Sequence, residues 1–298
     1  MNERRRPSLY VSDLDGTLLN GSAGLSESGR ARLTRLLEDG VEFTVASARG
    51  VASMRAILGG LPLRLPVIGF NGAYLSDLAT GRHEIVNAIE PAIASDLHAL
   101  IAGHGIPPLI ATFSGREDLV YYAEPANDGM HWWLKDREAS RDPRLRRLVD
   151  ATLALREQVV CLTGIGPLAL LTDIAARIRE TFAGLIELHV FENWYSPGWH
   201  WLTVHDRRAS KGQAVRELMR LRGLGDRRVV AFGDQTNDLA LLAAADEAVA
   251  VRNAIPEVLA IATQVIGSNE EDSVIEYIEQ HAASHSAAVA SAAAGTPA

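Results

Sequence analysis

Two aspartates follow a short apolar run near the amino terminus, in residues 9–17, which read LYVSDLDGT. The β-branched and aromatic residues of this run predict a buried strand, and Gly16 predicts a turn directly after it. Residues at the carboxyl end of a strand in an open α/β sheet face the crevice where ligands bind. Strand periodicity puts Asp13 and Asp15 on one side of the chain, unless the turn at Gly16 redirects the second. This stretch therefore favours an α/β sheet with carboxylates at its ligand-binding edge.

A pair of neighbouring carboxylates suits phosphate chemistry on Mg²⁺. The two groups repel each other, and a hard divalent cation relieves that repulsion. One carboxylate is then free to attack an electrophile, while the other donates and accepts protons. The alternative is a solvated Asp-rich turn that closes a strand, and the rest of the chain has to distinguish the two.

Composition limits the classes of protein to which the chain can belong. Its 298 residues leave room for two domains, and the net charge of −8 argues against nucleic-acid binding. Cys161 is the only cysteine, so an intrachain disulfide is excluded and a reducing cytoplasm is the expected compartment. The apolar run after the basic start meets Ser12 too soon for a signal peptide, and none reaches the roughly 18 residues of a membrane helix. We expect a soluble, cytoplasmic protein.

The pattern along the chain predicts a discontinuous catalytic domain with an insert. Strand-like and helix-like segments alternate up to about residue 84 and again from 205, which predicts a Rossmann-like, mainly parallel α/β sheet with helices on both faces. Residues 85–204 have a mixed α+β pattern and are expected to form an inserted domain, while 282–298 are expected to be a disordered tail. The sequence predicts helices at 26–40, 91–103, 167–181 and 211–222, and strands at 41–46, 67–70, 108–113, 118–123, 158–163, 186–191, 199–204 and 229–233.

Two further positions fall at predicted element ends. Ser47 follows the second strand with a hydroxyl and, at Ala48, a backbone N–H, both suited to a phosphate oxygen, although such a serine is more often a helix cap. Lys211 is one of only two lysines, with Lys135, and it opens a helix, where its charge opposes the macrodipole. A donor aimed at a phosphoryl group and at Asp13 explains that placement; a solvent-exposed lysine is the alternative.

Acids and an amide follow the strand at 229–233 as well. Asp234 is a candidate cation ligand, and Asn237 offers an amide donor to phosphate. Asp238, at a helix start, is placed either to hold a metal-bound water or to orient Lys211. Helix capping would explain each of these positions separately, but it would have to be invoked at every one of them.

The set of motifs resembles the haloacid dehalogenase (HAD) superfamily, and within it the Cof-type phosphatases with a type 2 (IIB) cap. Asp13 to Thr17 resemble its first motif, Ser47 its second, Lys211 its third, and Gly233-Asp234 through Asn237-Asp238 its fourth. The segments FNGA at 70–73 and VRNAIPE at 251–257 agree with it. Two positions depart from the family pattern, since Ala48 and Ser273 stand where glycine is usual.

The resemblance implies roles for these residues. Asp13 would be the nucleophile that forms an aspartyl-phosphate, and Asp15 would protonate the leaving group and then activate water. Asp13, the backbone carbonyl of Asp15 and Asp234 would hold Mg²⁺. The phosphoryl oxygens would be held by Ser47, the Ala48 N–H, Lys211 and Asn237. Asp238 would support these residues without touching the phosphate.

The resemblance also implies that the insert is a cap that selects a small phosphorylated metabolite. All five tryptophans lie in the insert, and aromatic faces pack against sugars, so a sugar phosphate is favoured, with core packing as the alternative role of these residues. The net charge and the lack of a long apolar run argue against nucleic acid and membrane as partners. Two alternatives remain open: a phosphosugar mutase that uses the same intermediate, and a non-catalytic sensor of a phosphorylated ligand.

Overall fold

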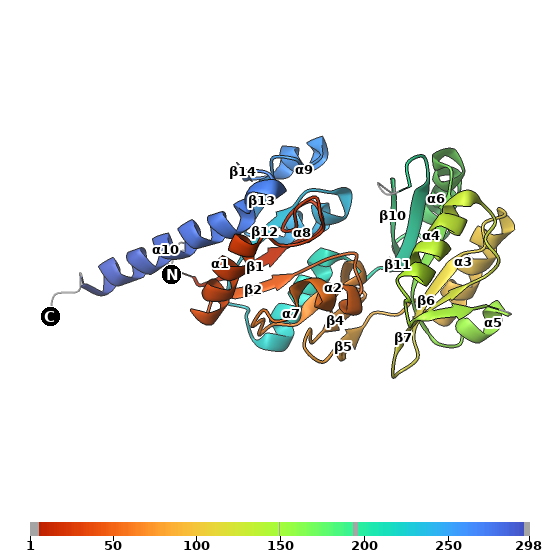
Figure 1. Ribbon diagram of the computed structural model, residues 1–298, viewed down its shortest axis with the longest axis horizontal. Coiled ribbons are helices and arrows are strands. Elements are labelled where there is room, and N and C mark those ends of the chain that lie inside the picture. Colours follow the sequence, from red (N-terminus) through yellow and green to blue (C-terminus); the bar gives the residue numbers. More distant parts are fainter. Residues whose placement is uncertain (1–5, 149, 193–195, 295–298) are drawn as a thin grey trace. The chain divides into compact units, whose positions relative to one another are not determined.

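The computed structural model describes residues 6–148, 150–192 and 196–294, with side chains as far as residue 284 (Figure 1). Two compact units divide the chain. The first combines Met1–Ile85 with Ser210–Ala298, and the second is the continuous segment Val86–Ala209. Each unit has a hydrophobic core of its own.

A parallel sheet of five strands forms the centre of the first unit, in the order β14-β13-β12-β1-β2. Its middle strands carry runs of buried apolar residues, as expected where helices cover both faces of a sheet. This confirms the predicted mainly parallel α/β fold. The strands are β1 (Ser8–Ser12), β2 (Glu42–Val45), β12 (Arg228–Gly233), β13 (Glu247–Val251) and β14 (Gln264–Ile266).

The helices of this unit begin and end at recognisable caps. The Ser26 hydroxyl accepts a hydrogen bond from the Gly29 N–H at the start of α1, as predicted, and the Ser210 hydroxyl does the same for Gln213 at the start of α7. Gly223 ends α7 in the left-handed conformation. The helices are α1 (Glu27–Glu38), α2 (Val51–Leu58), α7 (Lys211–Arg222), α8 (Leu239–Ala244), α9 (Pro256–Ile261) and α10 (Ser273–Ala294).

The predicted strand at 67–70 ends one residue earlier, at Gly69, because the chain turns into the 3-10 segment η2 (Phe70–Gly72). The strand β3 (Val67–Gly69) joins β2 through a single parallel bridge between Ala46 and Ile68. On its other side it pairs with the antiparallel β4 (Tyr74–Ser76), next to β5 (His83–Val86).

The second unit is an α+β structure built on a six-stranded sheet in the order β10-β11-β9-β6-β7-β8. Its pairs are antiparallel except β7 with β8. Apolar residues of its sheet pack with those of α3 and α6 in one core. The elements are α3 (Pro91–Gly103), β6 (Leu109–Phe113), β7 (Asp118–Tyr122), α4 (Asp128–Ala139), β8 (Leu145–Arg147), α5 (Ala151–Ala154), β9 (Gln158–Gly166), α6 (Leu168–Thr181), β10 (Ile186–Glu192) and β11 (His200–Asp206).

The helix α4 and the carboxyl-terminal tail also differ from the sequence expectation. The helix α4 was not predicted, because only Met130 and Trp133 give its middle a buried face, too short a repeat to stand out in the sequence. At the carboxyl end, α10 continues to Ala294 through most of the expected tail. Alanine favours helix strongly, so an Ala-rich segment attached to a packed helix extends it. Among the described residues, no helix combines the length and apolarity needed to cross a bilayer.

Substitution of Gly212 should strongly destabilise the first unit. A Cβ atom at this position of α7 would lie 2.3 Å from the Ala240 carbonyl oxygen of α8, so the helices would have to separate. We expect Gly212→Ala to lower the free energy of unfolding by about 1–3 kcal/mol, measured by urea denaturation. Gly225→Ala is the matched control, because a Cβ there meets nothing within 4 Å. Equal stability of the two variants would contradict the tight α7–α8 packing.

Candidate active site

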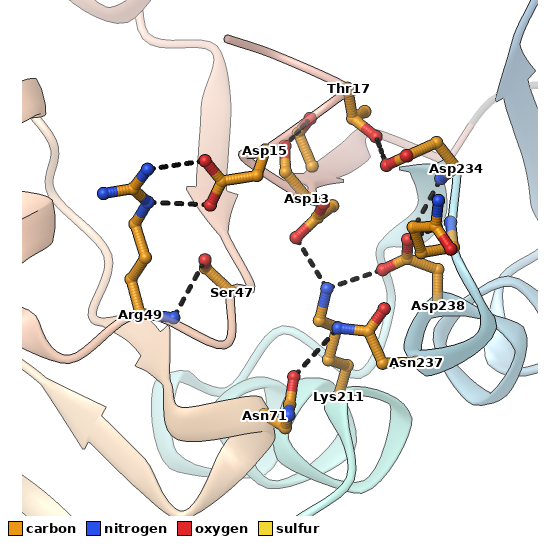
Figure 2. A network of polar contacts seen from close by, with 12 residues as sticks. Asp13, Asp15, Thr17, Ser47, Arg49, Asn71, Lys211, Asp234, Asn237 and Asp238 are labelled. Carbon is orange, nitrogen blue, oxygen red and sulfur yellow. Dashed lines mark hydrogen bonds and ion pairs between the residues drawn. The ribbon is translucent and has the colours of Figure 1, made fainter. Parts of the chain in front are cut away.

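A buried lysine joins two carboxylates at the carboxyl edge of the parallel sheet (Figure 2). The Lys211 Nζ donates to Asp13 Oδ1 and to Asp238 Oδ1, both at 2.6 Å, and its side chain is fully buried. Asp13 directly follows β1, and Lys211 is the first residue of α7. The exposed-lysine alternative is therefore wrong, and Lys211 lies where the sequence predicted, against Asp13.

Asp238 fixes the lysine from the other side. Its Oδ2 accepts hydrogen bonds from the backbone N–H groups of Asp234 and Gln235, both at 3.0 Å, while Oδ1 holds Lys211. Both oxygens are thus already bonded within the protein. Of the two roles left open by the sequence, the geometry favours orientation of Lys211.

Burial and mutual repulsion perturb the acids of this cluster. Burial raises the pKa of Asp13 well above its usual range, with the Lys211 ammonium opposing the shift and the carboxylates of Asp238 and Asp234 adding to it. Burial raises the pKa of Asp234 to about 6, and the negative charge of Asp238 is the second largest cause of this shift. Burial acts against the charged form of Lys211, but Asp13 and Asp238 outweigh it and raise the pKa of the lysine.

The donor set fits a divalent cation. Asp13, Asp234 and Asp238 each offer a carboxylate oxygen, and these atoms lie within 4.8 Å of one another. With all groups ionised, three carboxylates and one ammonium carry a net charge of −2, which Mg²⁺ would neutralise. Asp13 and Asp234 were predicted as ligands. Asp15 enters the predicted set only through its backbone carbonyl, and its carboxylate lies elsewhere.

The carboxylate of Asp15 is held by an arginine that the sequence analysis did not identify. Arg49 donates from Nε to Asp15 Oδ2 at 2.7 Å and from NH2 to Oδ1 at 2.6 Å. Asp13 bonds instead to Lys211, so the turn at Gly16 does redirect the second aspartate. Figure 2 shows the two carboxylates directed at different cations.

The predicted phosphate-binding residues approach the same edge. Ser47 is buried, and its Oγ accepts a hydrogen bond from the Arg49 N–H at 3.1 Å, which leaves the hydroxyl proton to donate. Ala48, next to it, is exposed. Asn237 donates from Nδ2 to Asn71 Oδ1 at 3.0 Å. Asn71 was singled out only as part of a family segment.

Other residues missed from the sequence hold the acids in place. The Thr17 hydroxyl donates to Asp234 Oδ1 at 2.6 Å, and Asn253 donates from Nδ2 to the Gly16 carbonyl. Gly16 has a φ of 78°, and a Cβ there would lie 2.5 Å from Asp234 Oδ2, so glycine alone lets the two loops approach. Thr17 lies in the first motif and Asn253 in the segment 251–257, so both residues could have been singled out from the sequence.

Comparison with known proteins identifies the family. Residues 10–278 match the haloacid dehalogenase-like hydrolases. The chain therefore belongs to this family, which confirms the resemblance drawn from its motifs, including the Cof type, and its class as a hydrolase.

Two relatives match over nearly their whole length. The 5-amino-6-(5-phospho-D-ribitylamino)uracil phosphatase YitU of Bacillus subtilis is 24% identical over 93% of this chain and 98% of its own. The pyridoxal phosphate phosphatase YbhA of Escherichia coli is 27% identical over 90% and 96%. Among solved structures, a sugar phosphatase of HAD subclass IIB superposes with a TM-score of 0.67 at 18% identity, covering 92% of this chain and 98% of that one, and it shares the fold.

Removal of the Lys211 charge should destabilise the protein in the absence of metal. Lys211→Met leaves Asp13 and Asp238 without their shared buried cation, so we expect a loss of about 3–5 kcal/mol in unfolding free energy, measured by urea denaturation in EDTA. Lys135→Met is the control, since Lys135 is exposed on α4 and is the only other lysine. A loss no larger than that of the control would mean that the buried ion pairs contribute nothing to folding.

Proposed function

We propose that this protein is a Mg²⁺-dependent phosphatase that hydrolyses a small phosphomonoester through an aspartyl-phosphate on Asp13. The observation that carries the proposal is the contact of the buried Lys211 with Asp13 Oδ1, beside the cluster of Asp13, Asp234 and Asp238. The expected enzyme class, a phosphoric monoester hydrolase of the HAD type, agrees with the family and with the relatives that are named phosphatases.

Asp13 is the nucleophile of the first step. One of its carboxylate oxygens forms a bond to phosphorus while the ester P–O bond breaks, and the electron pair of that bond goes to the leaving oxygen. Lys211 holds Oδ1 and restricts rotation of the carboxylate. Because the lysine remains charged, it also offers positive charge to the phosphoryl oxygens as their charge shifts.

The remaining oxygen contacts come from three positions. The Ser47 hydroxyl, the Ala48 N–H and the Asn237 amide would hold the phosphoryl oxygens and keep the phosphorus in line with Asp13. Their positions at the ends of β2 and β12 support this role, because these ends lie beside the carboxyl end of β1 in the sheet.

Asp15 moves the proton. Once released from Arg49, Asp15 takes a proton from solvent and gives it to the leaving alkoxide. The resulting carboxylate then takes a proton from the water that attacks phosphorus, and this proton serves the next turnover. The bond between Asp13 and phosphorus then breaks, which regenerates the carboxylate and frees inorganic phosphate. The exposed position of Asp15 is consistent with an acid that meets both a leaving group and water.

Asp13, Asp234 and the backbone carbonyl of Asp15 would hold Mg²⁺. The ion would offset the negative charge that accumulates where phosphate meets buried carboxylates. The proximity of carboxylate oxygens from Asp13 and Asp234, which lie within 4.8 Å of each other, supports this assignment.

The substrate is proposed to be a small phosphorylated metabolite, with a sugar phosphate favoured, and the unit Val86–Ala209 is proposed as the cap that selects it. The relatives support the general class, because their names specify a phosphorylated ribitylaminouracil and pyridoxal phosphate. A cytoplasmic location is proposed from the single cysteine, which is buried and free.

Replacement of the nucleophile is the direct test. We expect Asp13→Asn to reduce phosphate release from a panel of sugar phosphates, nucleotides and pyridoxal phosphate by at least about a thousandfold, because an amide cannot form the intermediate. Asp226→Asn, on the surface, is the control and should retain activity. Release that survives Asp13→Asn would refute the mechanism. Activity that needs a bisphosphate primer and liberates little phosphate would indicate the mutase instead.

Metal dependence is tested separately. Treatment with EDTA should abolish phosphate release, and excess Mg²⁺ should restore it, because the cluster retains uncompensated negative charge without a cation. Calcium, which prefers more ligands and longer bonds, serves as a comparison and should restore less activity. Full turnover in EDTA would rule out the metal assignment.

A further inference from the structure

Three consecutive residues beside the site have a positive φ. The values are 46° for Phe70, 55° for Asn71 and 108° for Gly72. Glycine accepts such angles freely and asparagine tolerates them, but an aromatic residue does so only when its surroundings impose the conformation. Strained backbone of this kind concentrates at functional sites. The turn η2 therefore calls for an explanation in terms of what it contacts.

The main chain of the turn is bonded to the loop that carries Ser47. The Phe70 N–H donates to the Arg49 carbonyl at 3.0 Å, and the Asn71 N–H donates to the Ser47 carbonyl at 2.9 Å. These two bonds fix the backbone on both sides of Ala48. The turn thus determines where the Ser47 hydroxyl and the Ala48 N–H lie.

The same turn contacts the segments that carry the other two phosphate-binding residues. A Cβ on Gly72 would lie 2.7 Å from the carbonyl oxygen of Ser210, the residue before Lys211. The Asn71 Oδ1 accepts the hydrogen bond from Asn237 Nδ2 at 3.0 Å (Figure 2). Three loops that are distant in sequence are therefore in contact with residues 70–72.

Aromatic packing holds the strained turn in place. The Phe70 ring meets Tyr74 edge to face, with centroids 5.7 Å apart, and Tyr74 stacks on His83 at 3.9 Å. Tyr74 is fully buried and Asn71 is nearly so. The surroundings thus supply the support that the backbone conformation needs.

We propose that Asn71 is a positioning residue that holds the amide of Asn237 and the Ser47 loop where both can bind the transferring phosphoryl group. The inference rests on the proposed function. The Asn237 amide donates one of its two N–H groups to Asn71. This bond fixes the orientation of the amide and leaves the second N–H to donate to phosphate. Asparagine alone combines tolerance of a positive φ with an uncharged side-chain acceptor of this length.

Asn71→Gly separates these two properties. Glycine retains the backbone conformation and removes the acceptor, so the variant should fold as the parent does. We expect about a tenfold rise in KM for the best phosphomonoester of the panel and in the dissociation constant of orthovanadate measured by calorimetry, with a smaller change in kcat. Arg141→Gly is the matched control, because Arg141 is an exposed residue of the second unit with a φ of 51°.

A double-mutant cycle with Asn237→Ala tests whether Asn71 acts through Asn237. In the Asn237→Ala background, Asn71→Gly should change KM by less than about twofold, because the amide that it orients is already absent. Additive effects, or an unchanged KM in Asn71→Gly alone, would overturn the inference. Failure of the proposed function is distinct from either result, since phosphate release would then persist in Asp13→Asn.

Discussion

The buried ammonium of Lys211 is the interaction on which the site depends. A lysine without solvent contact is costly, and it is retained only where carboxylates compensate for the lost hydration. Asp13 and Asp238 do so from the segments that follow β1 and β12, and the start of α7 supplies the lysine. The carboxyl ends of β1 and β12 must therefore lie side by side, with the first turn of α7 against them. The ion pairs of Lys211 and the pairing of β1 with β12 therefore require the same placement of these segments.

The rest of the site follows from the negative charge that one lysine leaves uncompensated. Backbone N–H groups donate to Asp238 and a hydroxyl donates to Asp234, and the carboxylate oxygens of the cluster lie close enough together to hold a dication. The charge of Asp15 is compensated separately, by Arg49. The two acids of the first motif thus differ in their partner and their exposure, as the proposed roles of attack for Asp13 and proton exchange for Asp15 require.

Sequence reasoning located Asp13, Lys211 and Asp234 because rules for strand ends and helix starts apply to each position alone. It could not supply Arg49 or Asn71 as partners, since their roles depend on which side chain lies opposite after folding. Arg49 is one of many arginines, and the special property of Asn71 is a backbone angle. The helix α4 was missed for a related reason, because its buried face is short. The pairs of Lys211 with Asp13 and Asp238 were predictable because each partner was already a candidate, whereas pairs with a residue outside the candidate set were not.

The pairing of β1 with both β2 and β12 has a consequence for synthesis on the ribosome. As the nascent chain emerges, β2 becomes available soon after β1, but β12 follows only after the whole of Val86–Ala209. Until then one edge of β1 lacks its partner, and unpaired strand edges promote aggregation. The second unit is continuous and can complete its own sheet during this interval. Folding of the insert would therefore leave the half-built central sheet as the part of the nascent chain that is exposed to aggregation.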